Sequence, residues 1–202
     1  MKHARRRVES EESFGLRDTL IWCGIPIVIV LLVRMFLFGF YVIPSGSMLE
    51  TLQIGDHLLV NKFLYGLRNP FNDDYLIRGV EPKVGDIIVF RYPKDRSLDY
   101  IKRIVGVPGD TLEMRNKVLY RNGVEVQEPY TQHSQPLIMI PGRDNWGPIT
   151  VPADKFFALG DNRDDSADSR FWGFLDRNDI RGKAWRIYWS ADGLSNIRLN
   201  RI

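Results

Sequence analysis

A long run of apolar residues near the start of the chain dominates the hydrophobic pattern of the sequence. Between residues 20 and 49 the only charged residue is Arg34, and residues 20–41 read LIWCGIPIVIVLLVRMFLFGFY. About 20 helical residues cross the roughly 30 Å hydrocarbon core of a bilayer. The pattern therefore predicts one transmembrane helix over 20–41, with Trp22 and Tyr41 at its two interfaces.

The distribution of positive charge around this segment predicts its orientation. The chain begins with the basic stretch MKHARRR, and after Arg34 no Lys or Arg occurs before Lys62. By the positive-inside rule, residues 1–19 form a cytoplasmic tail and residues 42–202 lie on the outer side of the membrane.

A cleavable signal peptide is the alternative interpretation of the same segment. The basic start fits it, and Ser45 and Ser47 are small residues spaced as a cleavage site requires. However, the apolar stretch exceeds the usual 7–15 residues, and Arg34 would interrupt it. These two features favour an anchor that stays in place.

The pattern changes after residue 42 to short segments in which apolar and polar residues alternate. Such segments, bounded by Gly, Pro, Asn and Asp, are typical of β-strands in a sandwich or barrel. Asn122-Gly123 between two of them is a strong hairpin signal. Residues 130–148 (YTQHSQPLIMIPGRDNWGP) predict a long loop or lobe insertion. The predicted strands are 86–90, 100–105, 118–121, 124–126, 156–159 and 184–189.

Composition and charge narrow the class of protein only slightly. The 202 residues suit one domain plus an anchor, and 44% hydrophobic with 26% charged residues is an ordinary globular composition. The net charge of +3 comes from Lys and Arg that are spread among acids, so we expect no nucleic-acid partner. With Cys23 as the single cysteine, an intramolecular disulfide and a cysteine-based zinc site are excluded.

Ser47 is the first candidate for chemistry, because it lies in the segment PSGSM directly after the predicted anchor. Gly46 gives the backbone freedom to aim the Ser47 amide and a neighbouring hydroxyl at one point, as an oxyanion hole requires. An ordinary Ser/Gly turn is the alternative.

Lys102 is the second candidate, because it interrupts an apolar strand. With a period of two, its side chain shares a face with Tyr100 and Ile104, which would desolvate the ammonium group and lower its pKa. A neutral lysine can act as a general base. A lysine on a solvated strand face is the alternative interpretation.

The third candidate is the polar loop 160–170, which reads GDNRDDSADSR. Its composition predicts a hydrogen-bonded loop at the end of a strand, and a purely structural loop with an Asp168–Arg170 ion pair is the alternative. The acids could suit Ca²⁺, but the EF-hand pattern fails because it lacks Gly at the sixth and Glu at the twelfth position.

The sequence argues against histidine as the base for Ser47. Outside the predicted tail only His57 and His133 remain, and neither lies in a motif typical of a catalytic triad. No G-x-S-x-G elbow surrounds Ser47, and Glu50 replaces the Lys of the β-lactamase pattern. Lysine remains, and Ser–Lys pairs are a known variant of the triad.

After a single span, three motifs follow in the order PSGSM, YIKRIVGVPGD and GDNRDDSADSR. In these motifs the chain resembles bacterial signal peptidase I. The segments GDIIVFRYP and RFWGF add to the likeness. The resemblance implies a mainly β fold, in which an N-terminal transmembrane helix precedes an antiparallel β catalytic domain with a smaller variable lobe at about 111–155. It also implies a serine endopeptidase that removes signal peptides from exported preproteins after Ala-x-Ala sites.

The resemblance assigns roles by position. Ser47 is expected to be the nucleophile, Lys102 the general base and Ser45 an oxyanion donor, while Ser166 holds the Lys102 amine. The expected ionic support consists of Asp161, Arg103, Asp168 and Arg170. The expected substrate-binding residues are Tyr41, Ile43, Pro44, Met48, Leu52, Leu58, Val89, Asp99, Tyr100 and Ile101.

No metal or organic cofactor is expected, and the expected partners are secreted preproteins, the lipid bilayer and the secretion translocon. Two positions depart from the family pattern: Glu50 where Pro is common, and Asp165 where Asn is frequent.

Three alternatives remain: a maturation peptidase of the same superfamily with one substrate, a self-cleaving repressor, and an inactive membrane-tethered binding module. The span in place of a DNA-binding domain argues against the second. The presence of all of Ser47, Lys102 and Ser166 argues against the third.

Overall fold

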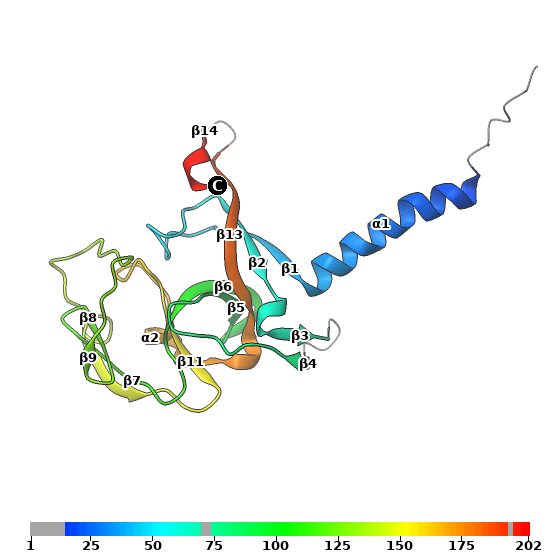
Figure 1. The fold of residues 1–202 in the computed structure, drawn as a ribbon. Helices are drawn as coiled ribbons and strands as arrows, with labels where there is room; N and C mark the ends of the chain where they lie inside the picture. Colours follow the sequence, from blue (N-terminus) through cyan, green and yellow to red (C-terminus); the bar gives the residue numbers. More distant parts are fainter. Residues whose placement is uncertain (1–14, 70–73, 194–195) are drawn as a thin grey trace, which may run out of the picture.

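The computed structural model of the chain describes residues 15–69, 74–193 and 196–202, and Figure 1 shows its fold. Most of the predicted cytoplasmic tail, residues 1–14, lies outside the described residues. The helices are α1 (Leu16–Phe36) and α2 (Ser169–Trp172), with 3₁₀ turns at Phe63–Tyr65, Arg177–Asp179 and Leu199–Arg201. The strands are β1 (Phe38–Val42), β2 (Asp56–Asn61), β3 (Gly66–Arg68), β4 (Tyr75–Arg78), β5 (Ile87–Tyr92), β6 (Asp95–Gly106), β7 (Thr111–Arg115), β8 (Val118–Arg121), β9 (Val124–Glu125), β10 (Trp146–Thr150), β11 (Lys155–Leu159), β12 (Leu175–Asp176), β13 (Ile180–Asp192) and β14 (Asn196–Ile197).

The described strands form three antiparallel sheets, so the predicted mainly β fold is confirmed. The largest has the order β1-β2-β13-β5-β6-β11-β12, with β14 paired to β13. In β2 every second residue is buried (Asp56, Leu58 and Val60), which is the period expected of a strand with one face on the core. Strands β3 and β4 form a small hairpin sheet of their own.

A second sheet, in the order β10-β7-β8-β9, is built from residues 111–150. It falls within the segment where the sequence predicts a variable lobe. Its Asn122-Gly123 turn joins β8 to β9 with both residues at positive φ (54° and 79°), so the predicted hairpin is confirmed. The division of the chain into a core and a variable lobe remains a prediction.

Helix α1 projects away from the sheets (Figure 1). The predicted end of the helix at residue 41 is wrong, because α1 ends at Phe36 and β1 begins at Phe38. Strand β1 pairs with β2, and the Lys62 ammonium donates to the carbonyls of Arg34 and Met35, which the helix end leaves without partners. Among the described residues, no helix meets the combined length and hydropathy of a membrane span.

Three apolar clusters fill the molecule, and one of them lies under the segment that carries Ser47. One cluster includes Phe90, Ile104 and Phe156 of the large sheet, and another packs the 111–150 sheet onto Phe157 and Leu159. The third is built from Ile43, Met48, Leu52, Leu58, Val60 and Val89. This third cluster anchors both ends of the segment between β1 and β2.

Candidate active site

Ser47 lies in the segment that joins β1 to β2, and the loop after β11 holds its backbone in place. The Asn162 amide donates to the Ser47 carbonyl (3.1 Å), and the Asn162 side chain donates to the Gly46 carbonyl (3.2 Å). On the other side of Ser47, Met48 is fully buried in the third apolar cluster. Ser47 is therefore fixed between a hydrogen-bonded loop and an apolar anchor.

Lys102 reaches Ser47 from the middle of β6. Its Nζ lies 2.7 Å from Ser47 Oγ and 2.8 Å from the Ile101 carbonyl oxygen. The residue is 3% exposed, and Nζ lies 5.5 Å from the centre of the Tyr100 ring. The predicted burial of Lys102 in an apolar strand is thus confirmed.

The surroundings of Lys102 favour its neutral form. Burial lowers the pKa of Lys102 to about 8, although the negative charges of Asp168 and Asp161 oppose this shift. A hydroxyl that is hydrogen-bonded to such an amine can lose its proton to it as it attacks a carbonyl carbon. The pair can therefore supply a nucleophile and a base without histidine.

The loop 160–170 brings two buried carboxylates close to this pair, and each has an arginine partner. Arg103 makes a two-pronged contact with Asp161 (2.9 and 2.7 Å), and Arg170 makes another with Asp168 (2.8 and 2.7 Å). The predicted Asp168–Arg170 pair is present. Two-pronged arginine–carboxylate pairs fix the orientation of both side chains. The loop is consequently rigid where it faces Lys102.

Ser166 lies beside Gly160, as does the Ser47 carbonyl, but it does not make the contact expected of it. Among the described residues its buried Oγ has no hydrogen-bond partner, because Lys102 Nζ is directed at Ser47 and Ile101 instead. A methyl group on Gly160 would lie 2.2 Å from Ser166 Oγ and 2.5 Å from the Ser47 carbonyl oxygen. The predicted contact with the Lys102 amine is therefore replaced by close packing beside Ser47.

Ser47 and Lys102 open onto a cleft of about 370 Å³. Segments 44–47 and 99–102 form most of its lining, and the loop after β11 contributes Asp165 and Ala167. Of the predicted substrate-binding residues, Pro44, Asp99, Tyr100 and Ile101 line the cleft, as does the predicted oxyanion donor Ser45. The others belong to the third apolar cluster, where Ile43, Met48, Leu52, Leu58 and Val89 are buried and Tyr41 packs against them.

Comparison with known proteins connects this geometry to a family. A family model described as "Signal peptidase, peptidase S26" matches residues 16–189. A signal peptidase I of Pseudomonas aeruginosa is 39% identical over 206 residues, covering 84% of this chain and 72% of that protein. Signal peptidase I P of Bacillus subtilis subsp. natto is 40% identical over 196 residues, covering 93% of this chain and 97% of that protein. A crystal structure of a signal peptidase I from Enterococcus faecalis shares 33% identity and a TM-score of 0.43, covering 52% of this chain and 97% of that one.

The chain belongs to the signal peptidase family. It is accordingly a hydrolase, and removal of signal peptides is the activity that the family supports. The resemblance inferred from the three motifs is confirmed at this level.

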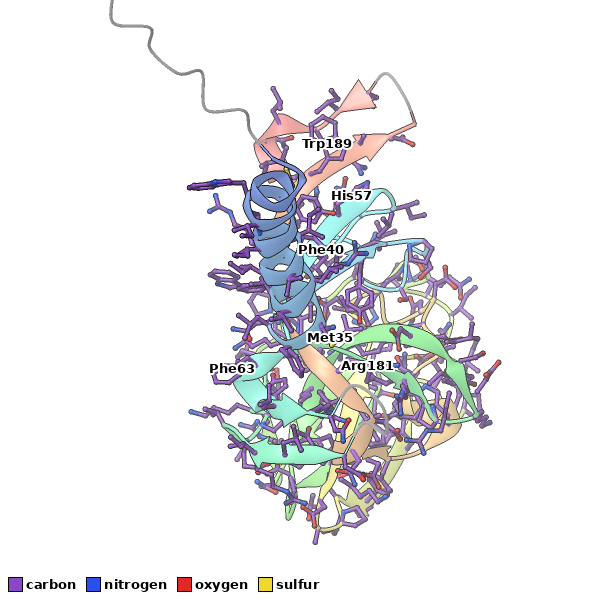
Figure 2. The ribbon with its side chains drawn as sticks, turned by 90° about the vertical axis from the view of Figure 1, so that its right-hand side faces the viewer. Met35, Phe40, His57, Phe63, Arg181 and Trp189 are labelled. Carbon is purple, nitrogen blue, oxygen red and sulfur yellow. The ribbon has the colours of Figure 1, made fainter. Side chains whose placement is uncertain are left out.

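The histidines of this signal peptidase lie among other partners. His57 packs edge-on against Tyr188, whose ring also contacts Phe40, on the face shown in Figure 2. His133 Nδ1 lies 3.7 Å from the Asp164 carboxylate. Neither histidine is among the residues that line the cleft.

Several residues that hold the site together were not singled out from the sequence. Thr51 donates to Asp161, the Arg103 guanidinium lies 3.9 Å from the centre of the Tyr130 ring, and Asn162 holds the backbone of Ser47. Asn162 lies in the polar loop 160–170, for which the sequence predicted hydrogen bonding without naming a partner. Thr51 and Tyr130 carried none, because their partners are distant in sequence.

Three of the four acids of the loop 160–170, Asp161, Asp164 and Asp168, have cationic partners rather than a common centre. Lys117 binds Asp164 at 2.8 Å, in addition to the two arginine pairs described above. Within the described part of the chain, no three His, Cys, Asp or Glu side chains come together as metal ligands would.

Proposed function

We propose that the chain is a membrane-bound serine endopeptidase that cleaves signal peptides from exported preproteins after Ala-x-Ala sites. In this proposal Ser47 is the nucleophile and Lys102 the general base. The observation that carries it is the 2.7 Å contact between Ser47 Oγ and the Nζ of a buried lysine whose pKa is lowered to about 8.

The reaction begins when neutral Lys102 accepts the Ser47 hydroxyl proton and Ser47 Oγ attacks the carbonyl carbon of the scissile bond. The Ser45 hydroxyl and the Ser47 amide stabilise the resulting oxyanion. Protonated Lys102 then gives its proton to the leaving amine as the peptide bond breaks. Water hydrolyses the acyl-enzyme in the same way, with Lys102 again the base.

The preprotein binds as an extended segment between residues 43–45 and 99–101. Backbone pairing of this kind adds a strand and places alternate side chains in pockets. Ile101, which lines the cleft, packs against the cluster in which Met48, Val89 and Leu58 are buried, and this packing supports shallow subsites. Shallow apolar subsites favour alanine at alternate positions.

Supporting groups keep Lys102 neutral and in place. The Asp161 and Asp168 carboxylates are each neutralised by an arginine, which limits their tendency to raise the pKa of Lys102. The Ser166 hydroxyl, buried and without a partner among the described residues, is available to hold the amine once Ser47 has reacted.

Membrane attachment through α1 is part of the proposal. From Ile21 to Met35 the large apolar side chains of α1 are exposed, with Trp22 70% exposed. Large aromatic side chains on β1 and β13 (Phe40, Trp185, Trp189) are also 40–64% exposed. Figure 2 shows Phe40 and Trp189. Exposed apolar surface of this extent is typical of contact with a membrane. We expect the chain to resist extraction from membranes by alkaline carbonate. Release of the chain into the supernatant would contradict the membrane anchoring but not the proposed peptidase activity.

The dyad is tested with purified Ser47→Ala and Lys102→Ala variants and a peptide containing Ala-x-Ala, with the cleavage position read by mass spectrometry. We expect each variant to lose at least about a thousandfold in kcat/KM. Ser97→Ala and Lys94→Ala are matched controls on exposed residues that lie outside the cleft. Undiminished cleavage by either dyad variant would reject the proposed mechanism.

A further inference from the structure

The cleft contains two carboxylates besides the Ser47–Lys102 pair, and they differ in their partners. Asp99 faces Arg181, whose Nε lies 3.4 Å away, and it also accepts a hydrogen bond from Tyr41. Asp165 is exposed and lines the same cleft. Its carboxylate makes no ion pair or hydrogen bond with any residue that the structure describes, so Asp165 is the carboxylate of the cleft that is open to a ligand.

The backbone of Asp165 is held firmly, although its side chain is open. Its amide donates to the Asn162 carbonyl (3.2 Å), and the preceding residue, Asp164, is fixed by Lys117 and by the Gln135 amide. The following residue, Ser166, is buried beside Ser47. The backbone at Asp165 therefore loses little conformational entropy when the carboxylate binds a partner.

The negative charge of Asp165 would make the cleft select substrates by the charge of their side chains. Lys102 is neutral in the reactive form of the enzyme, so in that form the pair offers no positive charge to balance Asp165. A cationic substrate side chain beside Asp165 gains an ion pair, whereas an acidic one meets a like charge in a partly desolvated space.

We infer that Asp165 is a specificity-determining residue, whose carboxylate favours preproteins with a Lys or Arg near the cleaved bond and disfavours those with Asp or Glu there. This inference rests on the endopeptidase activity proposed above and adds to it a preference for charge. Ala-x-Ala recognition by shallow apolar subsites would act at other positions of the same substrate.

The test uses the full chain and a set of Ala-x-Ala peptides. In these peptides one position at a time carries Lys, Gln or Glu. The varied positions run from three residues before the cleaved bond to three residues after it, apart from the two alanines. At one position we expect kcat/KM to be about tenfold higher for Lys than for Glu, since an attraction and a repulsion of partly exposed charges are each worth up to about threefold to fivefold. The preference should weaken in 1 M salt, where the screening length is about 3 Å.

Variants then assign the preference to Asp165. Asp165→Asn should reduce the Lys-to-Glu ratio at that position to about one, and Asp165→Lys should invert it. Asp192→Asn, an exposed aspartate at the far end of β13, is the matched control and should leave the ratio unchanged.

Two results would overturn the inference, and they are distinguishable. If the unaltered chain and Asp165→Asn give the same Lys-to-Glu ratio at every position, Asp165 does not select charge, while the proposed peptidase stands. If no Gln peptide is cleaved by the unaltered chain, the proposed function fails and the inference fails with it.

Discussion

Lys102 shows at the scale of a single residue how far sequence alone can reach. The period of the strand predicted that its side chain shares a face with Tyr100 and Ile104, and its burial beside the Tyr100 ring follows from that period. The strand period does not predict the contacts with Ser47 Oγ and the Ile101 carbonyl, because they depend on how β6 meets the segment after β1. Only the family resemblance paired Lys102 with Ser47.

The lowered pKa of Lys102 also predicts how stability depends on pH. Its value of about 8 lies below that of an unfolded lysine, so between about pH 8 and 10.5 the unfolded state binds more protons and folding gains stability as pH rises. Relative to Lys102→Met, the free energy of unfolding of the unaltered chain should therefore increase by about 2–3 kcal/mol between pH 7 and 11. Denaturant titrations at the two pH values measure this difference.

Lys94→Met, at an exposed lysine, provides the control. Relative to this variant, the free energy of unfolding of the unaltered chain should show no such increase with pH. If the difference in the free energy of unfolding between Lys102→Met and the unaltered chain stayed constant with pH, Lys102 would have an ordinary pKa.

At the scale of elements, the sequence located strands better than it located the helix end. Predicted strands 86–90, 100–105, 118–121 and 156–159 overlap β5, β6, β8 and β11. Strand β1 was missed, because its apolar residues continue the hydrophobic run of α1 and only pairing with β2 separates the two elements. The short strands β3 and β4 were also missed, since their stability comes from pairing with each other.

Gly160, at the junction of β11 and the polar loop, gives a prediction at this scale. A Cβ there would collide with Ser166 Oγ and with the backbone oxygen of Ser47, neither of which can move without disturbing the site. Gly160→Ala should lower the free energy of unfolding by about 1–3 kcal/mol, as overpacking of a dense site does, and should reduce kcat/KM at least about a hundredfold. Thermal unfolding and the peptide assay measure the two effects.

Gly24→Ala is the control, because a Cβ at Gly24 would meet nothing within 4 Å. If Gly160→Ala cleaved peptide as fast as the Gly24→Ala variant, the close packing of Ser166 against Ser47 would be irrelevant to activity.

At the scale of the whole molecule, buried ion pairs tie the turn between β7 and β8 and the segment after β9 to the loop that supports the site. Glu128 makes a two-pronged contact with Arg163 (2.7 and 2.7 Å), and Lys117 binds Asp164. These partners lie 35 and 47 positions apart in the chain. The polar composition of 160–170 predicted a hydrogen-bonded loop, but a single sequence gives no means of naming such distant partners.

The Glu128–Arg163 pair gives the prediction at this scale. Arg163 and Glu128 side chains are 2% and 6% exposed, so Glu128→Gln would leave a buried guanidinium without its counter-charge. We expect a loss of about 3–5 kcal/mol in the free energy of unfolding, measured by denaturant titration. Glu113→Gln, whose partner Arg115 is 60% exposed, is the matched control and should have no measurable effect. Equal effects of the two variants would show that the buried pair does not hold the lobe to the loop.

The pH dependence of kcat/KM on an Ala-x-Ala peptide tests most directly whether the Ser47–Lys102 pair performs the chemistry. Only neutral Lys102 can accept the Ser47 proton, so the rate should rise with pH along a limb with an apparent pKa of about 8, set by the free enzyme. The position of this limb should be unchanged in His57→Gln and in His133→Gln. A limb near pH 6.5 that disappears with either histidine would contradict the account, because the base would then be an imidazole.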